Sequence, residues 1–335
     1  MESPSCLLPG DQMTIHLSTD TIEVQITPNR GADITRLIHR PTGINVFAES
    51  PTGDVTNSQS SWSDSMTQWI NGYPGGWQVL LPNAGPERQW EGAHQGFHGE
   101  ASLASWAVRE QTADRCELDT SLLTAPIHVH RTVTVKQSRL TVIDRISNLS
   151  PQPTAFRLCQ HPAFGHHFLD ESSYLVTTAG RFIADSDNPG SLARPNATGA
   201  PTDILPSGPL PNSVSLPGPG SGDSLFGALT EFVPEGGRDQ NASVTFVSPT
   251  KQLAATVSWD AAVFPYTWFW IEANAMQTWP WFQRLYSVAV EPANILPGSG
   301  FGPAGYERGG PGTTLDAGET LTSEVSISLD PHPSH

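Results

Sequence analysis

The sequence predicts an all-β protein built as a large antiparallel β-sandwich, and three observations support this. Apolar and polar residues alternate in short segments, spaced roughly 8–12 residues apart between residues 103 and 160. Thirty Gly and thirty Pro indicate many turns. No segment has the pattern of an amphipathic helix longer than about two turns. Short strands joined by turns, without helical crossovers, favour antiparallel sheets packed face to face.

The strand pattern can be followed along the chain. Alternation begins at residues 21–26 and resumes at 32–38, after a turn at Pro28–Gly31. The clearest pair is 128–135 and 140–146, whose four-residue linker suits a hairpin. Later strands are expected at 243–247, 253–259, 267–272, 285–291 and 320–329.

Two long segments lack this alternation. Residues 48–72 are rich in Ser, Thr, Asn and Gly, and they predict a loop that carries Trp62 and Trp69. Residues 180–222 are dense in Pro, Gly and Ser. Because strands resume after residue 225 without a new start, we interpret 180–222 as a surface loop within a single domain, 1–335.

The charge balance limits the partners. Lys and Arg total 17 and Asp and Glu total 33, which gives a formal net charge of −16. Such a surface repels phosphate backbones and anionic lipid, so we expect neither nucleic acid nor membrane as a partner. No run of about 20 apolar residues predicts a membrane span. The N-terminus has no basic and apolar signal pattern, so we expect a cytoplasmic location.

The cysteines and the remaining histidines give little sign of a metal. Cys6, Cys116 and Cys159 are far apart, and we expect reduced thiols without a structural zinc. His128 and His130 share one strand face and could chelate a metal, but no third ligand is near, so an exposed strand face is favoured. No Gly-rich phosphate loop or nucleophile motif is present, and no cofactor is expected.

Three segments carry residues suited to chemistry. His98 precedes Gly99, where the backbone can turn sharply. His161 precedes Pro162, which holds it in an extended conformation. Glu291 ends an apolar strand, where partial desolvation would raise its pKa. A histidine and a carboxylate in one cleft make an acid/base pair, although each alone has a structural alternative, such as a turn cap for Glu291.

The order of these segments resembles the aldose 1-epimerase (galactose mutarotase) family. An HG segment, the His161-Pro162-Ala163-Phe164 segment and a late Glu after a short apolar strand follow one another as in that family. The Asn29–Ala32 turn and the run from Gly75 to Gly85 are also similar to its bacterial members. The resemblance implies the galactose mutarotase-like supersandwich, with a sugar bound in an open cleft on one sheet.

The resemblance also implies roles. The residue matching Glu291 takes the proton of the anomeric hydroxyl, the one matching His161 protonates the ring oxygen, and the one matching His98 binds that oxygen. No cofactor takes part, and the expected partner is a small-molecule sugar on a monomer or homodimer. Interconversion of the α and β anomers of an aldose is therefore the expected activity.

Some positions depart from the family pattern. Galactose mutarotases carry an arginine upstream of the first histidine, where this chain offers Gln78, Asn83 and Arg88 as substrate-binding candidates. Hexose-6-phosphate mutarotases have an arginine shortly after the HG segment, whereas Glu100 follows here, so an unphosphorylated sugar is expected. The loop at 180–222 replaces the part that often supplies a sugar-binding Asp, which leaves that ligand unassigned.

Tryptophan is concentrated late in the chain. Five of the ten tryptophans lie between residues 259 and 281, and flat indole faces stack on sugar rings. Trp268 and Trp270 are either such a platform or part of the core or an interface, and the second interpretation is favoured. Trp77, beside two glycines, is the preferred platform.

Two other functions stay open. A non-catalytic carbohydrate-binding protein would keep the aromatic surface but would not need the acid/base pair. Another sugar isomerase or a lyase is also possible on the same fold, because a fold does not fix the reaction. The presence of both His161 and Glu291 favours the epimerase.

Overall fold

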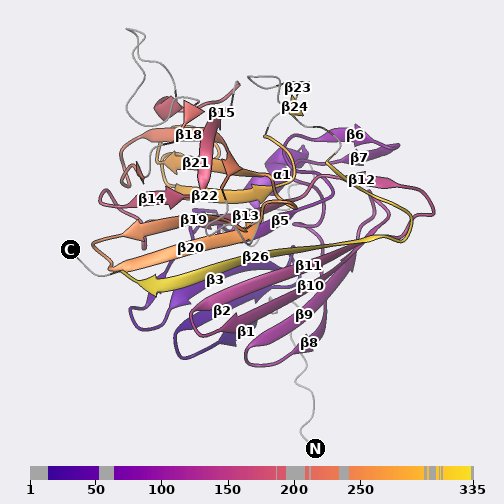
Figure 1. The fold of residues 1–335 in the computed structure, drawn as a ribbon, viewed down its shortest axis with the longest axis horizontal. Coiled ribbons are helices and arrows are strands. Elements are labelled where there is room, and N and C mark those ends of the chain that lie inside the picture. Colours follow the sequence, from indigo (N-terminus) through magenta and orange to yellow (C-terminus); the bar gives the residue numbers. More distant parts are fainter. Residues whose placement is uncertain are drawn as a thin grey trace, which may run out of the picture.

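The computed structural model of the chain (Figure 1) describes residues 14–52, 64–185, 187–193, 208–210, 213–233, 241–297, 300–301, 307–308, 310 and 312–332. Within these residues the regular structure is nearly all β-strand. The exceptions are helix α1 (Ser65–Asn71) and one 3-10 turn, η1 (Ser191–Ala193). No helix in the described part is long and apolar enough to cross a membrane.

The first large sheet has eleven strands, and it carries the candidate site. Its strands pair antiparallel in the order β1-β2-β3-β5-β13-β22-β21-β18-β15-β16, and β4 adds to β3. In chain order these strands are β1 (Ile15–Ser18), β2 (Ile22–Thr27), β3 (Asp33–His39), β4 (Ile44–Asn45), β5 (Trp77–Leu80), β13 (Cys159–Phe164), β15 (Ala179–Ala184), β16 (Gly208–Pro209), β18 (Asp223–Phe232), β21 (Tyr266–Ala273) and β22 (Tyr286–Ala293).

The second large sheet has nine strands in the order β17-β14-β19-β20-β26-β11-β10-β9-β8. Its strands are β8 (Ala107–Gln111), β9 (Arg115–Ser121), β10 (Ile127–Lys136), β11 (Arg139–Asn148), β14 (Tyr174–Thr177), β17 (Val214–Ser215), β19 (Asn241–Ser248), β20 (Leu253–Asp260) and β26 (Thr320–Pro331). Three small two-stranded sheets pair β6 (Arg88–Trp90) with β7 (Ala93–Gln95), β12 (Thr154–Phe156) with β25 (Thr313–Leu315), and β23 (Gly300–Phe301) with β24 (Glu307–Arg308).

The core lies between the two large sheets. Side chains of both, such as Val24 and Phe164 from the first and Val129 and Phe246 from the second, belong to one buried apolar cluster. Alternation along β10 shows how the sequence produces it, since every second residue from Ile127 to Val135 is buried. The predicted antiparallel β-sandwich is thus confirmed, as is the hairpin of β10 and β11.

Two segments differ from the expected loops. Part of 48–72 folds as α1, because Asp64 caps the helix by accepting a hydrogen bond from the Thr67 N–H at 2.8 Å. Trp69 lies on that helix, whereas Trp62 falls outside the described residues. The described parts of 180–222 include most of β15, and also β16 and β17, so this segment is not one continuous loop.

A buried polar network crosses the core beneath the first sheet. Asp144 on β11 accepts two hydrogen bonds from Arg131 on β10, at 2.7 and 2.8 Å, and a third from Gln160 on β13 at 2.7 Å. The amide oxygen of Gln160 in turn accepts a hydrogen bond from the Trp77 indole at 2.9 Å. This chain of hydrogen bonds links β10 and β11 of one sheet to β13 and β5 of the other.

The Asp144→Asn variant should lose about 3–5 kcal/mol of unfolding free energy, because it leaves the Arg131 charge buried without a counter-charge. Urea unfolding of both proteins would measure the loss. The matched control is Asp119→Asn, which breaks a pair with the exposed Arg109 and should cost less than about 1 kcal/mol. Equal losses for the two variants would contradict the role given to the core network.

Candidate active site

The two central strands β13 and β22 bring His161 and Glu291 together. The strands pair antiparallel, with Cys159 opposite Ala293 and Ala163 opposite Ala289. Along β13 the side chain of Gln160 enters the core network, so the next residue, His161, points to the opposite face of the sheet. The His161 Nε2 lies 3.6 Å from the Glu291 Oε1.

Burial governs the protonation of this pair. Glu291 is 2% exposed and His161 is 6% exposed. Burial raises the pKa of Glu291 well above the usual carboxyl range. It lowers the pKa of His161 to about 4. Desolvation therefore disfavours both charges while proximity favours them, so the ionised and neutral forms of the pair come closer in energy.

The second carboxylate oxygen of Glu291, Oε2, has only a weak hydrogen-bond donor near it. Its Oε2 lies 3.8 Å from the Cys159 thiol, which also contacts the Gln160 carbonyl at 3.6 Å. Burial raises the pKa of Cys159 well above its usual value, so the thiol stays protonated. A thiol is a weak hydrogen-bond donor. An ionised Glu291 would therefore remain a strong proton acceptor.

His98 is held in a defined orientation beside this pair. Its Nδ1 accepts a hydrogen bond from the Gly85 N–H at 3.1 Å, and the backbone N–H of His98 donates to the Gly85 carbonyl at 3.0 Å. Burial lowers the pKa of His98 well below the usual value, so the ring is neutral. Because Nδ1 accepts, the proton of the neutral ring is on Nε2, which is a hydrogen-bond donor.

The backbone at His98 is strained. Its φ is +61°, a left-handed conformation that is uncommon outside glycine. The following Gly99 also has a positive φ of +73°, and a Cβ there would lie 2.4 Å from the Leu81 carbonyl oxygen. This tight approach brings the HG segment against the end of β5. Strain of this kind is often concentrated at functional sites.

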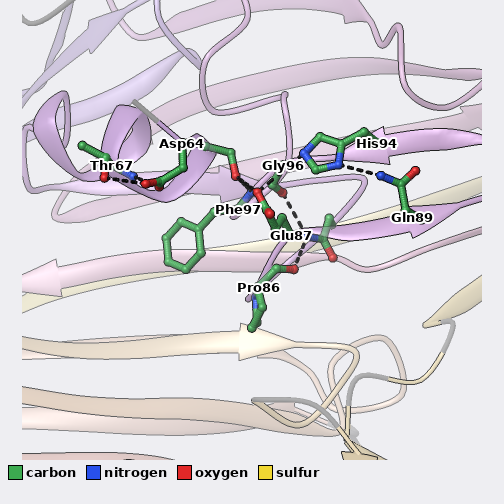
Figure 2. Close-up of polar contacts among 10 residues, drawn as sticks. Asp64, Thr67, Pro86, Glu87, Gln89, His94, Gly96 and Phe97 are labelled. Atoms are coloured by element: carbon green, nitrogen blue, oxygen red, sulfur yellow. Dashed lines mark hydrogen bonds and ion pairs between the residues drawn. The ribbon is translucent and has the colours of Figure 1, made fainter. Parts of the chain in front are cut away.

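Helix α1 and the β6–β7 hairpin support the same region (Figure 2). Ser65, at the start of α1, donates a hydrogen bond to Glu87 and accepts one from the Phe97 N–H at 3.1 Å. The side-chain amide of Asn83 donates to the Pro86 and Gly96 carbonyls, at 2.8 and 3.0 Å. These contacts fix the segment that leads into His98.

Aromatic rings surround the two histidines. The Trp69 ring lies 4.6 Å from His98 and 6.0 Å from His161, between ring centroids. Tyr73 lies 5.8 Å from His161, and Trp270 lies 6.3 Å from it. The Tyr73 hydroxyl is buried and has no hydrogen-bond partner in the structure. These aromatic rings bury the two histidines, and burial disfavours the charged form of each ring.

These residues line a cleft of about 700 Å³. His98, His161 and Glu291 all face it, so the structure brings the three predicted chemical residues together. Such a volume lies within the roughly 300–1,000 Å³ of clefts that hold small molecules. No Lys or Arg lines the cleft among the residues that the structure describes.

Sequence reasoning missed three carboxylates of this cleft, Asp185, Asp187 and Glu272. Asp185 follows β15, and its Oδ1 accepts the N–H groups of Asp187 and Asn188 at 2.9 and 2.8 Å. Glu272 lies on β21, and its Oε1 accepts the N–H groups of Ala275 and Met276 at 2.6 and 2.9 Å. Asp185 was hidden in the segment taken as one loop, whereas Glu272 falls two residues after Trp270 on an expected strand.

Trp77 and Gln78 do not line the cleft. Trp77 begins β5 instead of lying in a loop, and its indole is fully buried in the core against Gln160. The prediction that Trp77 is the sugar platform is therefore wrong. Gln78 lies directly opposite His161 in the β5–β13 register, but it is 1% exposed and donates to the Gly75 carbonyl at 2.6 Å.

Asn83 and Arg88 are also placed elsewhere. Asn83 is fully buried, and its side-chain N–H groups donate to the loop carbonyls named above. Its Oδ1 accepts a hydrogen bond from Arg157 at 3.3 Å. Arg88 donates to Gln95 at 2.8 Å and to the Pro82 carbonyl at 3.2 Å. Its guanidinium stacks on Trp90. Both residues support the scaffold around the HG segment, so their assignment to substrate binding is corrected.

The late tryptophans reach the cleft that Trp77 does not. Trp268 and Trp270 both line it, and the Trp268 indole donates to the Ile295 carbonyl at 2.8 Å. Trp270 is the more exposed of the two. The favoured interpretation as a core residue is confirmed for Trp268, which is 2% exposed. Trp270 is only partly buried and lines the cleft, so it is the candidate for an aromatic platform.

The outer face of β9 and β10 does not form a metal site. The His128 and His130 side chains lie 3.6 Å from Asp119 and Glu117, respectively, as half-buried pairs. Across the described residues there is no group of three His, Cys, Asp or Glu arranged to hold a metal.

Known proteins resemble the chain at two levels. A family model described as "Domain of unknown function (DUF4432)" matches residues 11–329. No curated protein sequence matches the chain. Among solved structures, the Slr1438 protein of Synechocystis is similar with a TM-score of 0.67 and 19% identity, over 99% of this chain and 100% of that chain.

Two further structures share the architecture. A galactose mutarotase-like protein of Lactobacillus casei has a TM-score of 0.64 at 18% identity, over 95% of this chain and 100% of that one. The GalM/aldose epimerase homologue of C. elegans has a TM-score of 0.64 at 13% identity, over 96% and 99%. At these identities the likeness shows the fold, which is the galactose mutarotase-like sandwich.

Glu291→Gln should stabilise the protein increasingly as the pH rises above the normal carboxyl range. A raised pKa in the folded state favours the protonated form, so wild-type stability is lost as the pH rises toward the folded pKa. The amide cannot ionise and escapes this loss. Thermal melts of both proteins between pH 4 and 8 would measure it.

The matched control is Glu117→Gln on the outer face of β9. The Arg115 guanidinium lowers the pKa of Glu117, so the stability due to its charge is lost as the pH falls. Its melting-temperature difference from wild type should change with pH in the opposite direction. A Glu291→Gln difference that stays constant with pH would contradict the buried, easily protonated carboxyl.

Proposed function

This chain belongs to the family of the domain of unknown function DUF4432, and we propose from the chemistry of its cleft that it is an aldose 1-epimerase. In this proposal it interconverts the α and β anomers of an unphosphorylated sugar. The observation that carries the proposal is the buried His161–Glu291 pair, 3.6 Å apart at the floor of an aromatic cleft.

The pair supplies the two proton transfers that ring opening needs. Glu291 accepts the proton of the anomeric hydroxyl while His161 donates a proton to the ring oxygen, which breaks the bond between that oxygen and C1. Rotation about the C1–C2 bond and reversal of both transfers give the other anomer. No electron acceptor or other co-reactant is required.

The environment suits both transfers. A general base is most effective when its pKa lies near the working pH, and burial moves the pKa of Glu291 upward in that direction. Proton transfer from His161 to the sugar leaves the pair in its neutral form, which the burial of both side chains favours. The Nε2–H of His98 can hydrogen-bond the ring oxygen or a neighbouring hydroxyl.

The walls also suit a sugar. Trp270 gives an indole surface for the C–H face of a ring, and Asp185 and Glu272 offer carboxylates for hydroxyl groups. A non-catalytic carbohydrate-binding protein remains the second candidate, because these walls alone would serve it. The acid/base pair favours the enzyme.

Freshly dissolved α-glucose and α-galactose should approach anomeric equilibrium faster with the wild type than without it, as polarimetry would measure. Glu291→Gln should lose most of this acceleration, about 100-fold or more, because the amide cannot accept the proton. Asp119→Asn, on the far sheet, should keep the wild-type rate.

If neither hexose responds, pentoses and deoxy sugars should be assayed in the same way. No acceleration across that panel, with tryptophan fluorescence still responding to a sugar, would replace the epimerase with the binding protein. Full activity in Glu291→Gln would remove Glu291 as the base.

Glucose 6-phosphate should be accelerated at least about tenfold less than glucose, in kcat/KM. The carboxylates of Asp185 and Asp187 line the cleft, and they repel a dianion. Polarimetry at matched ionic strength, corrected for the uncatalysed rate of each sugar, would compare the two. A preference for the phosphorylated sugar would contradict an acid-lined cleft.

A further inference from the structure

The cleft extends beyond its catalytic floor to an exposed mouth. The floor residues His161 and Glu291 are 6% and 2% exposed. At the mouth, Met66, Met276 and Trp279, which line the same cleft, are 42%, 40% and 38% exposed. Exposed large apolar side chains that gather at one place usually mark a binding surface.

A polar side accompanies this apolar one. Asp187 and Asn188 also line the cleft and are exposed. We call Met66, Met276, Trp279, Asp187 and Asn188 the outer subsite. Apolar faces beside polar groups match a sugar ring, which has C–H faces and a rim of hydroxyl groups.

The apolar side of the outer subsite is held in place by hydrogen bonds. The Trp279 indole donates to the Asn71 side chain, at the end of α1, at 3.3 Å. Glu272 accepts the Met276 N–H at 2.9 Å, and the Met276 carbonyl accepts the Gln283 N–H at 2.7 Å. A preorganised surface loses little entropy when a ligand binds.

We propose that the outer subsite binds the second ring of a reducing, 4-linked disaccharide or longer oligosaccharide. This inference rests on the proposed epimerase. When O1 of the reducing ring contacts Glu291 and its ring oxygen contacts His161, C4 lies across the ring from C1. A substituent on O4 therefore points from the floor toward the mouth.

The size and composition of the cleft agree with this occupant. About 700 Å³ is more space than one hexose ring fills. A single ring bound at the floor would leave the exposed Trp279 and Met276 without a ligand contact. A second ring stacked on Trp279 would cover both and would place its hydroxyl groups near Asp187 and Asn188.

The test compares kcat/KM for mutarotation of glucose, cellobiose and maltose by the wild type and by Trp279→Ala. The wild type should prefer at least one disaccharide over glucose, and Trp279→Ala should reduce that preference about tenfold. The control is Phe282→Ala, in the same loop, which is 53% exposed and does not line the cleft. It should leave the preference unchanged.

The outcomes separate this inference from the epimerase itself. Acceleration of glucose without a preference for either disaccharide, or a preference that survives Trp279→Ala, overturns the outer subsite and leaves the epimerase standing. If no sugar is accelerated, calorimetric titration decides. Cellobiose or maltose binding more tightly than glucose, and more weakly in Trp279→Ala, supports the outer subsite, whereas no such difference overturns it.

Discussion

The carboxylate of Asp144 lies in the middle of the sandwich and receives hydrogen bonds from both sheets, two from Arg131 and one from Gln160. A buried charge needs such partners, and these partners come from strands that must therefore stay in register. Gln160 also accepts a hydrogen bond from the Trp77 indole, which links β5 to β13. Because Gln160 immediately precedes His161, the hydrogen-bond network around Asp144 also fixes the position of His161 on β13 and the face of the sheet to which its side chain points.

The opposite face of the same strands is organised by the exclusion of water. There Glu291 and His161 have few hydrogen-bond partners. Burial raises the pKa of Glu291 and lowers that of His161, so the neutral form of each is favoured. Burying an ionisable carboxyl costs folding stability. The same burial makes the carboxylate a stronger base when it is ionised, which favours proton transfer. In the core, by contrast, both carboxylate oxygens of the buried Asp144 accept hydrogen bonds.

Much of this could be predicted from the sequence. Alternation of period two gave the strands, and local oddities such as the His98-Gly99 pair pointed to chemical residues. Trp77 was misplaced because its two glycine neighbours indicate a loop, whereas it begins β5 and its indole donates a hydrogen bond to Gln160 in the core. Asp185 and Trp270 reach the cleft through long-range pairing of β15, β18 and β21, which no local pattern encodes. Helix α1 was not predicted, because the composition of residues 48–72 is that of a loop.

The orientation of a bound sugar is the measurement that tests the central claim most directly. A crystal structure of the protein with a sugar that it binds would locate C1, O1 and the ring oxygen. We predict that O1 contacts the Glu291 carboxyl, that the ring oxygen lies within hydrogen-bond distance of a histidine Nε2, and that C4 faces the mouth. A sugar bound with C1 toward the mouth, out of reach of Glu291, would contradict the account.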